Sequence, residues 1–233
     1  MEDTTALILE TSTPAASLAL VQSGKVTREL SFTSDRNHNA QLFAPLAELL
    51  GEIPISAVNL VLVGSGPGSY SGTRVGIAAA QGTAIAASCP AIAVPSILAI
   101  PSAEQGNACL MVGDARRGAF WTARVDELEL ISPPQITDAE DFFKQVEAAI
   151  AAGESVISFE KPDRFPLPEA MVAQVKLEFP TAGRLWQAWL ATPAATRSLW
   201  AAASPQPIYL KPPHITAAKR SWLIPPGASA ARP

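Results

Sequence analysis

The sequence is short of the residue types on which most metal, disulfide and nucleic-acid sites depend. Its 233 residues include two cysteines, two histidines and no basic run, and the net charge is −4. Cys89 and Cys109 form neither a CxxC pair nor a disulfide framework, which is typical of a reducing compartment. Because proteins that hold nucleic acid alone rely on clustered Lys and Arg, the composition argues against such a protein.

Long apolar segments are also absent, although 48% of the residues are hydrophobic. The opening stretch MEDTTALILE is acidic and carries only a short apolar run, unlike a signal peptide or a membrane span. We therefore expect a cytoplasmic, globular protein with a substantial core and no membrane contact.

Hydrophobic patterning predicts an α/β fold in the first half of the chain. Helix 39–52 places Leu42, Leu46, Leu49 and Leu50 on one face, and Ser23-Gly24 reads as a hairpin turn. The predicted strands are 6–12, 16–22, 25–32, 58–64 and 91–94, and a second helix is expected over 72–88.

The second half repeats this opening weakly, which predicts two lobes of related topology. Strands are expected within 108–131 and at 155–159, helices at 138–152 and 181–191, and Asp114 occupies a place similar to that of Glu10. Trp186 and Trp189 are expected in the core. The predicted domains are 1–104, 105–204 and a Pro-rich flexible tail, 205–233.

A glycine-rich loop before the helix at 72–88 raises the question of phosphate binding. The stretch VGSGPGSYSGTRVG does not fit the P-loop pattern, because no Lys follows Gly72, and it does not fit GxGxxG, because Ser69 stands where the third glycine belongs. Backbone amides before a helix can still hold an anion, and Glu10 with Asp114 could hold Mg²⁺ or simply end their strands in solvent. The candidate anion or nucleotide residues are Glu10, Gly66, Gly68, Ser69 and Asp114.

Small side chains recur every four residues along the same helix. Gly72, Gly76, Ala80, Ala84 and Ser88 form a stripe that lets a neighbouring backbone approach closely. The neighbour is either the chain's own sheet and first helix or another subunit, and the spacing leaves both open.

Catalytic and metal-binding patterns are not found. His38 and His214 are far apart in the sequence, so one imidazole cannot complete a transition-metal site. Ser69 and Ser71 have no evident His partner, and GxSxG does not occur. We expect no catalytic residue and no metal ligand. Arg74 opposes the dipole of its helix, which favours a carboxylate on a partner.

Five segments together resemble the TsaB family, the bacterial accessory subunits of tRNA threonylcarbamoyladenosine synthesis. They are LILETSTPAASLAL, HNAQLFAPLAELL, GPGSYSGTRVGIAAAQGTA, DARRGAFW and PIYLKP. The resemblance implies a duplicated actin-like α/β fold of the sugar kinase and Hsp70 type. It also implies a non-catalytic subunit that supports TsaD, which transfers a threonylcarbamoyl group to N6 of adenosine 37 in tRNAs reading ANN codons.

The resemblance further implies the partners and the surface that meets them. A third subunit, the TsaE ATPase, joins the pair, and the partner subunits hold ATP, ADP and Mg²⁺. The chain alone forms a homodimer, and it contacts tRNA only in the assembled complex. Family members pair through their first two helices. The interface residues expected here are His38, Gln41, Leu42, Pro45, Leu46, Leu49, Gly72, Arg74, Val75, Gly76, Ala79, Ala80 and Thr83.

The alternative function is a stand-alone actin-like ATP-dependent phosphotransferase. Such an enzyme clamps a nucleotide between glycine-bearing turns of both lobes. Here the first turn, ETSTPAAS, contains no glycine, and Glu160-Lys161-Pro162 follows the strand at 155–159. The sequence therefore favours the accessory subunit.

Overall fold

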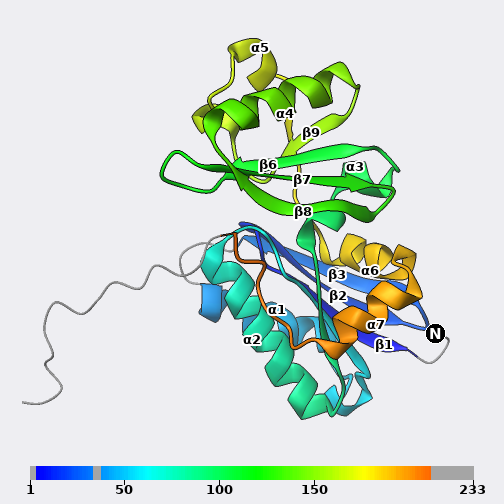
Figure 1. The fold of residues 1–233 in the computed structure, drawn as a ribbon. Coiled ribbons are helices and arrows are strands. Elements are labelled where there is room, and N and C mark those ends of the chain that lie inside the picture. Colours follow the sequence, from blue (N-terminus) through cyan, green and yellow to red (C-terminus); the bar gives the residue numbers. More distant parts are fainter. Residues whose placement is uncertain (1–3, 34–37, 211–233) are drawn as a thin grey trace, which may run out of the picture.

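Residues 4–33 and 38–210 are described by a computed structural model (Figure 1). Two five-stranded sheets, one in each lobe, carry the fold, and most helices lie on their faces. The first lobe is built from β1 (Thr5–Glu10), β2 (Ala15–Gln22), β3 (Lys25–Thr33), α1 (His38–Leu50), β4 (Leu60–Gly64), α2 (Tyr70–Ala87) and β5 (Ala91–Val94). This element order confirms the predicted one.

The second lobe repeats the strand pattern of the first. Its main elements are β6 (Cys109–Asp114), β7 (Phe120–Asp126), β8 (Glu129–Thr137), α4 (Ala139–Ala151), β9 (Ser155–Ser158) and β10 (Val175–Leu177). The strand orders are β3-β2-β1-β4-β5 and β8-β7-β6-β9-β10. In both sheets the first three strands are antiparallel and the last two run parallel to the first. The match confirms the duplicated, actin-like α/β fold.

Helices cover both faces of the first sheet, which explains why residues 6–9 of β1 form an unbroken apolar run. Since side chains alternate along a strand, Leu7 and Leu9 face α1 and α2, whereas Ala6 and Ile8 pack with Trp186. Trp186 belongs to α6 (Ala182–Ala191), which is followed by α7 (Ala194–Ala202).

The position of α6 and α7 corrects the expected assignment of residues 182–202 to the second lobe. Both helices pack on the first sheet, and the indole Nε1 of Trp186 donates to the carbonyl of Gly24 at 3.1 Å. Trp186 and Trp189 are buried as predicted, but in the core of the other lobe. Ala188 also contacts the second-lobe core around Met111, so α6 joins the two lobes.

Short helical segments connect the larger elements. The stretch between the lobes, with Ile97 and Leu98, is buried against Met111 and Trp121 of the second sheet. These segments are Ile55–Ala57, Ser96–Leu98, α3 (Pro101–Glu104), Pro162–Arg164 and α5 (Glu169–Val172).

Local backbone geometry explains how two predicted elements begin and end. Ser23 and Gly24 have φ values of 49° and 77°, as a tight two-residue hairpin requires, and they join β2 to β3. The side chain of Ser69 caps α2 by accepting from the amide of Gly72, and α2 ends at Ser88 in the left-handed conformation. Within the described parts of the chain, no helix is long and apolar enough to cross a membrane.

Candidate functional site

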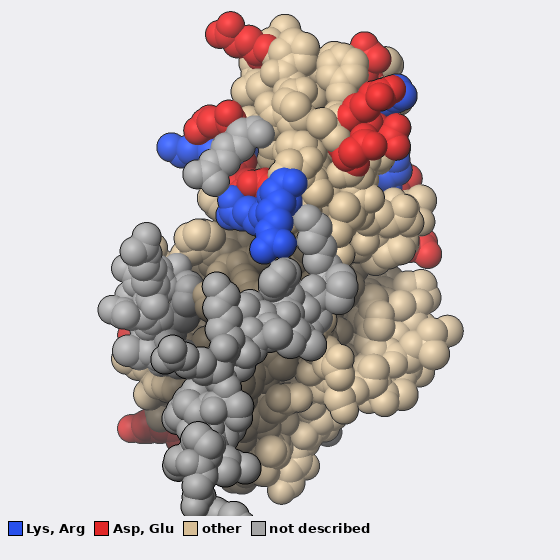
Figure 2. Space-filling model, turned by 60° about the vertical axis from the view of Figure 1, so that its left-hand side comes forward, with Lys and Arg blue, Asp and Glu red and all other residues tan. Residues whose placement is uncertain are grey.

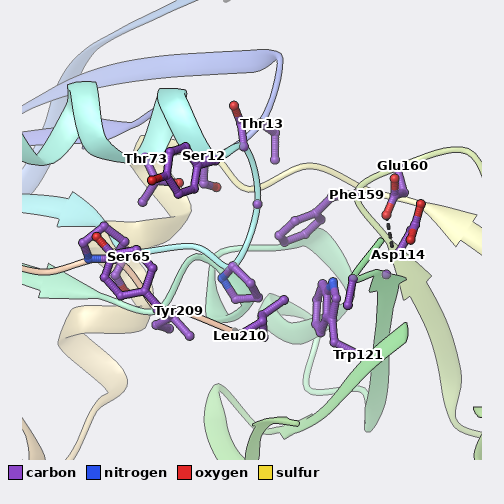
Figure 3. Close-up of a pocket in the computed structure, with 18 of the residues that line it drawn as sticks. Ser12, Thr13, Ser65, Thr73, Asp114, Trp121, Phe159, Glu160, Tyr209 and Leu210 are labelled. Carbon is purple, nitrogen blue, oxygen red and sulfur yellow. Dashed lines mark hydrogen bonds between the residues drawn. The ribbon is translucent and has the colours of Figure 1, made fainter. Parts of the chain in front are cut away.

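A cavity of about 810 Å³ opens between the two lobes (Figure 3). That volume is within the usual range of small-molecule sites. The ends of β1 and β4 and the start of α2 form one wall, and the ends of β6 and β9 form the other. The lining residues are Ser12, Thr13, Pro14, Ser65, Pro67, Gly68, Ser69, Tyr70, Thr73, Val112, Gly113, Asp114, Ala115, Arg116, Trp121, Phe159, Glu160, Pro207, Ile208, Tyr209 and Leu210.

The glycine loop lies at this cavity, and three of its backbone amides are bonded to other groups of the chain. The amide of Ser69 donates to the carbonyl of Ser12 at 2.6 Å, and that of Gly66 donates to Ser96 Oγ at 3.0 Å. The amide of Gly72 donates to Ser69 Oγ at 3.2 Å. A Cβ on Gly68 would overlap the carbonyl of Ser12, so glycine is needed here for close packing of two loops. These three amides are therefore not available to an anion.

Glu10 lies beneath the cavity wall and is fully buried. Its Oε1 accepts from the amide of Ser12 at 2.7 Å, and its Oε2 has no hydrogen-bond partner in the described structure. Burial raises the pKa of Glu10, against a smaller lowering by hydrogen bonds from Ser12. Of the five candidate anion or nucleotide residues, Gly68, Ser69 and Asp114 line the cavity, whereas Glu10 and Gly66 do not.

The second-lobe wall carries two carboxylates and one cation. Asp114 forms an ion pair of 2.9 Å with Arg116, and its amide donates to Glu160 Oε1 at 2.6 Å. Arg116 is the single cationic residue among the described residues that line the cavity. No group of three or more His, Cys, Asp or Glu side chains in the described residues is arranged to hold a metal ion.

Residues 205–210, here called the C-terminal strap, close one side of the cavity. The amide of Ile208 donates to the carbonyl of Ser65 at 2.9 Å, and Arg74 Nη2 donates to the hydroxyl of Tyr209 at 2.9 Å. The guanidinium of Arg74 also lies over the ring of Tyr70, 3.4 Å from its centroid. The expected flexible tail is thus corrected for these six residues; His214, Lys211, Lys219 and Arg220 lie outside the described residues.

The stripe of small residues on α2 faces into the first lobe. A Cβ on Gly72 would overlap the carbonyl of Thr11, and a Cβ on Gly76 would overlap Thr11 Oγ1. Ala80 and Ala84 are buried in the core with Leu42, Leu46 and Leu49 of α1. The neighbour that needs the close approach is the chain itself.

The predicted interface is therefore wrong at its buried positions, which pack inside the first lobe. These are Leu42, Leu46, Leu49, Gly72, Gly76, Ala80 and Thr83. The half-buried positions are Pro45, Arg74, Val75 and Ala79, and the side chains of His38 and Gln41 lie outside the described residues.

The chain is similar to known proteins over most of its length. A family model described as TsaD, tRNA N6-adenosine threonylcarbamoyltransferase, matches residues 31–204. The protein named tRNA threonylcarbamoyladenosine biosynthesis protein TsaB from Escherichia coli is 26% identical over 189 residues, 78% of this chain and 72% of that protein. The TsaB protein of Haemophilus influenzae is 31% identical over 131 residues. The chain belongs to the TsaB family.

Solved structures of the TsaB family, also called YeaZ, share the fold. The structure described as YeaZ from Pseudomonas aeruginosa gives a TM-score of 0.69 at 25% identity and covers 89% of this chain and 100% of that chain. The match to the Haemophilus influenzae TsaB covers 54% of this chain and 55% of that protein, so the chain spans about half the length of that relative.

The outer face of α1 and α2 carries exposed apolar side chains in this TsaB family member. Phe43, Tyr70 and Ile85 are 60%, 68% and 80% exposed. Ala78 and Gly82 lie on the same face of α2 as Ile85, and a Cβ on Gly82 would meet no atom within 4 Å. On the side of the molecule seen in Figure 2, most charged side chains lie on the second lobe, and the visible surface of the first lobe is largely uncharged.

Four further cavity residues, none of them among the predicted site residues, complete the site. Trp121, Phe159, Glu160 and Tyr209 meet at the cavity from three separate segments. Phe159 and Glu160 directly follow the parallel strand β9, and ligands of α/β sheets bind beyond the carboxyl ends of the strands. That rule was the available signal for both residues. Trp121 and Tyr209 lie in the segments DARRGAFW and PIYLKP, which carry the TsaB resemblance, and that resemblance was the signal available for them.

Proposed function

We propose that the chain is a non-catalytic subunit that pairs with a TsaD-like catalytic subunit. TsaD then transfers a threonylcarbamoyl group to N6 of adenosine 37 in tRNAs that read ANN codons. Membership of the TsaB family is the observation that carries this proposal. A TsaE-like ATPase joins the pair, and the partner subunits hold ATP, ADP and Mg²⁺. The chain contacts tRNA only in the assembled complex.

The chemistry of the cavity supports a role without phosphoryl transfer. Phosphate groups are held by free amides and cations, whereas the amides of Gly66, Ser69 and Gly72 are already bonded within the chain. Arg116 is paired with Asp114. No specific observation favours the stand-alone phosphotransferase.

The partner surface that we propose is the outer face of α1 and α2. Exposed apolar patches rimmed by polar residues mark interaction sites, and this face combines Phe43, Tyr70 and Ile85 with the small residues Ala78 and Gly82. Small side chains there allow a partner helix to approach closely. In the absence of TsaD, a second copy of the chain occupies the same face as a homodimer.

Gly82→Trp tests this surface because the site is open and a large side chain costs the fold little. We expect the variant to co-purify poorly with the TsaD-like subunit and to lower threonylcarbamoyl transfer to tRNA in the reconstituted reaction. Ala148→Trp is the matched control, since Ala148 is an exposed helical alanine on α4 of the second lobe. If Gly82→Trp binds the TsaD-like subunit as tightly as Ala148→Trp does, the proposed partner surface is wrong.

The subunit role is tested separately from its surface. The TsaD-like subunit, the TsaE-like ATPase and tRNA are assayed with and without this chain. Modification that depends on the chain supports the proposal. Equal modification without the chain, or hydrolysis of ATP by the isolated chain with transfer to a small acceptor, would refute it.

A further inference from the structure

The C-terminal strap crosses from the first lobe to the second along the cavity. The Ile208 amide is bonded to the Ser65 carbonyl of the first lobe. Leu210, two residues later, packs instead against the second-lobe core, as Ala115 and Phe159 do, and all three line the cavity. The described part of the strap therefore ends on the second-lobe wall.

Two carboxylates flank the place where Leu210 packs. Asp114 directly precedes Ala115, and Glu160 directly follows Phe159; Figure 3 shows the two carboxylates side by side. The carboxylate of Asp114 is paired with Arg116 at 2.9 Å.

Glu160 is the carboxylate of this wall without a paired cation. Its Oε1 accepts from the amide of Asp114 at 2.6 Å. None of the ion pairs formed among the described residues includes Glu160, although its side chain is half-buried. A carboxylate that is partly removed from water gains from a cation placed beside it.

The next residue along the chain is a lysine. The Cα of Lys211 lies about 3.8 Å from that of Leu210, and its ammonium is carried on a flexible four-carbon stem. Pro212 follows, and a residue before proline is restricted to extended conformations. This restriction lowers the backbone entropy that Lys211 loses when its side chain is fixed.

The distribution of charge favours the same pairing. Residues 211–233 contain four Lys and Arg residues and no Asp or Glu, whereas the whole chain has a net charge of −4. The excess of acidic groups therefore lies in residues 1–210. Opposite charges attract more strongly at a half-buried wall than in bulk water.

We propose that Lys211 forms an ion pair with Glu160, so that the chain's own tail occupies the second-lobe end of the cavity. The ammonium donates to the carboxylate of Glu160, while Oε1 keeps its bond from the Asp114 amide. The pair ties the strap, which is held to the first lobe at Ser65, to the second lobe. The contact lies beyond residue 204, where the family match ends, and it does not rest on the proposed function.

Cross-linking of the full chain with a water-soluble carbodiimide tests the contact. The reagent joins a lysine amine to a carboxylate as an amide, with loss of one water, when the two groups touch. We expect peptide mass spectrometry to find Lys211 joined to Glu160 in a product of monomer mass. Lys219 of the same tail is the internal comparison and should not be joined to Glu160. The product should disappear in Lys211→Arg, which keeps the charge and lacks the amine.

Lys211→Glu tests the effect of the pair on the strap. The change places like charge beside Glu160, so hydrogen exchange of the Ile208 amide should accelerate about threefold. Lys219→Glu makes the same change of charge in the same tail and should exchange as the parent does. Lys211→Arg keeps the cation and should also match the parent.

Cross-links of Lys211 to other carboxylates, Asp114 included, with none to Glu160 would overturn the proposal. A product of twice the chain mass would do the same, because it would place the tail of a second copy in the cavity. Equal exchange of the Ile208 amide in Lys211→Glu and Lys219→Glu would show that Lys211 does not hold the strap. Since these variants leave the outer face of α2 unchanged, each failure is distinct from a failure of the proposed subunit role.

Discussion

The side-chain oxygen of Thr11 occupies the space that a side chain on Gly76 would need. Thr11 Oγ1 also donates to the carbonyl of Gly72 at 2.8 Å. The end of β1 and the start of α2 are therefore in direct contact, and the glycines of α2 serve the internal packing of the first lobe.

Gly76→Ala should lower the free energy of unfolding by about 1–3 kcal/mol, because the added methyl group overfills the contact with Thr11. Gly82→Ala on the open side of the same helix should raise it by about 0.5–1 kcal/mol. Urea unfolding of both variants measures the difference. Similar effects at the two sites would contradict the placement of the small-residue stripe.

Glu10→Gln should change the pH dependence of stability. Burial raises the folded-state pKa of Glu10 above its ordinary 4.5, so the native protein holds this proton more firmly than the unfolded chain does. The contribution of the Glu10 carboxyl to the free energy of unfolding is fully present below pH 4.5, and it is lost as the pH rises through the folded-state pKa. The variant should therefore gain stability relative to the parent as the pH rises from 4.5.

Urea unfolding at a series of pH values checks this expectation. Glu48→Gln on the exposed face of α1 is the control and should follow the parent. A difference between Glu10→Gln and the parent that is constant with pH would contradict a raised pKa at Glu10.

Native alkylation should separate the two cysteines. Burial, with a smaller effect of the Glu178 charge, raises the pKa of Cys109 to about 11, and Cys109 is buried. Since the thiolate is the nucleophile, about one Cys109 thiol in a thousand is reactive at pH 8 even before access is considered. Iodoacetamide at pH 8 should modify the half-buried Cys89 first, as read by peptide mass spectrometry. Equal labelling without urea would refute the burial of Cys109.

Arg74→Ala should loosen the C-terminal strap. The change removes the hydrogen bond to Tyr209 and thereby weakens the neighbouring bond from the Ile208 amide to Ser65. Hydrogen exchange of the Ile208 amide should accelerate about fivefold, which corresponds to roughly 1 kcal/mol. Lys144→Ala on α4 serves as the control. Unchanged exchange at Ile208 would show that Arg74 does not hold the strap.

Much of the fold could be read from the sequence because the large elements bury whole faces. Strand β5 agrees with its predicted bounds, and α2 begins two residues earlier than predicted, at Tyr70. Helix α7 was missed because it is only nine residues long and none of its residues is fully buried. Strand β10 was missed because it has three residues, and only Val175 is buried.

The functional surfaces were harder to predict because periodicity identifies a face but not its neighbour. The spacing of Gly72, Gly76 and Ala80 correctly indicated close packing, and it could not tell an internal contact from a partner. Likewise, the cavity brings Trp121 and Phe159 together from segments distant in the sequence, and no local pattern marks such a meeting.

The packing of α6 on the first sheet separates the order of synthesis from the order of folding. One face of that sheet is closed by Leu185 and Trp186, and the amide of Ala182 donates to Ser17 Oγ at 2.8 Å. A nascent chain that has reached only the end of the second sheet still exposes Ala6, Ile8 and Ala19 to water. The first lobe to leave the ribosome is thus completed only when the last helices emerge, and until then this apolar face is a natural target for a chaperone.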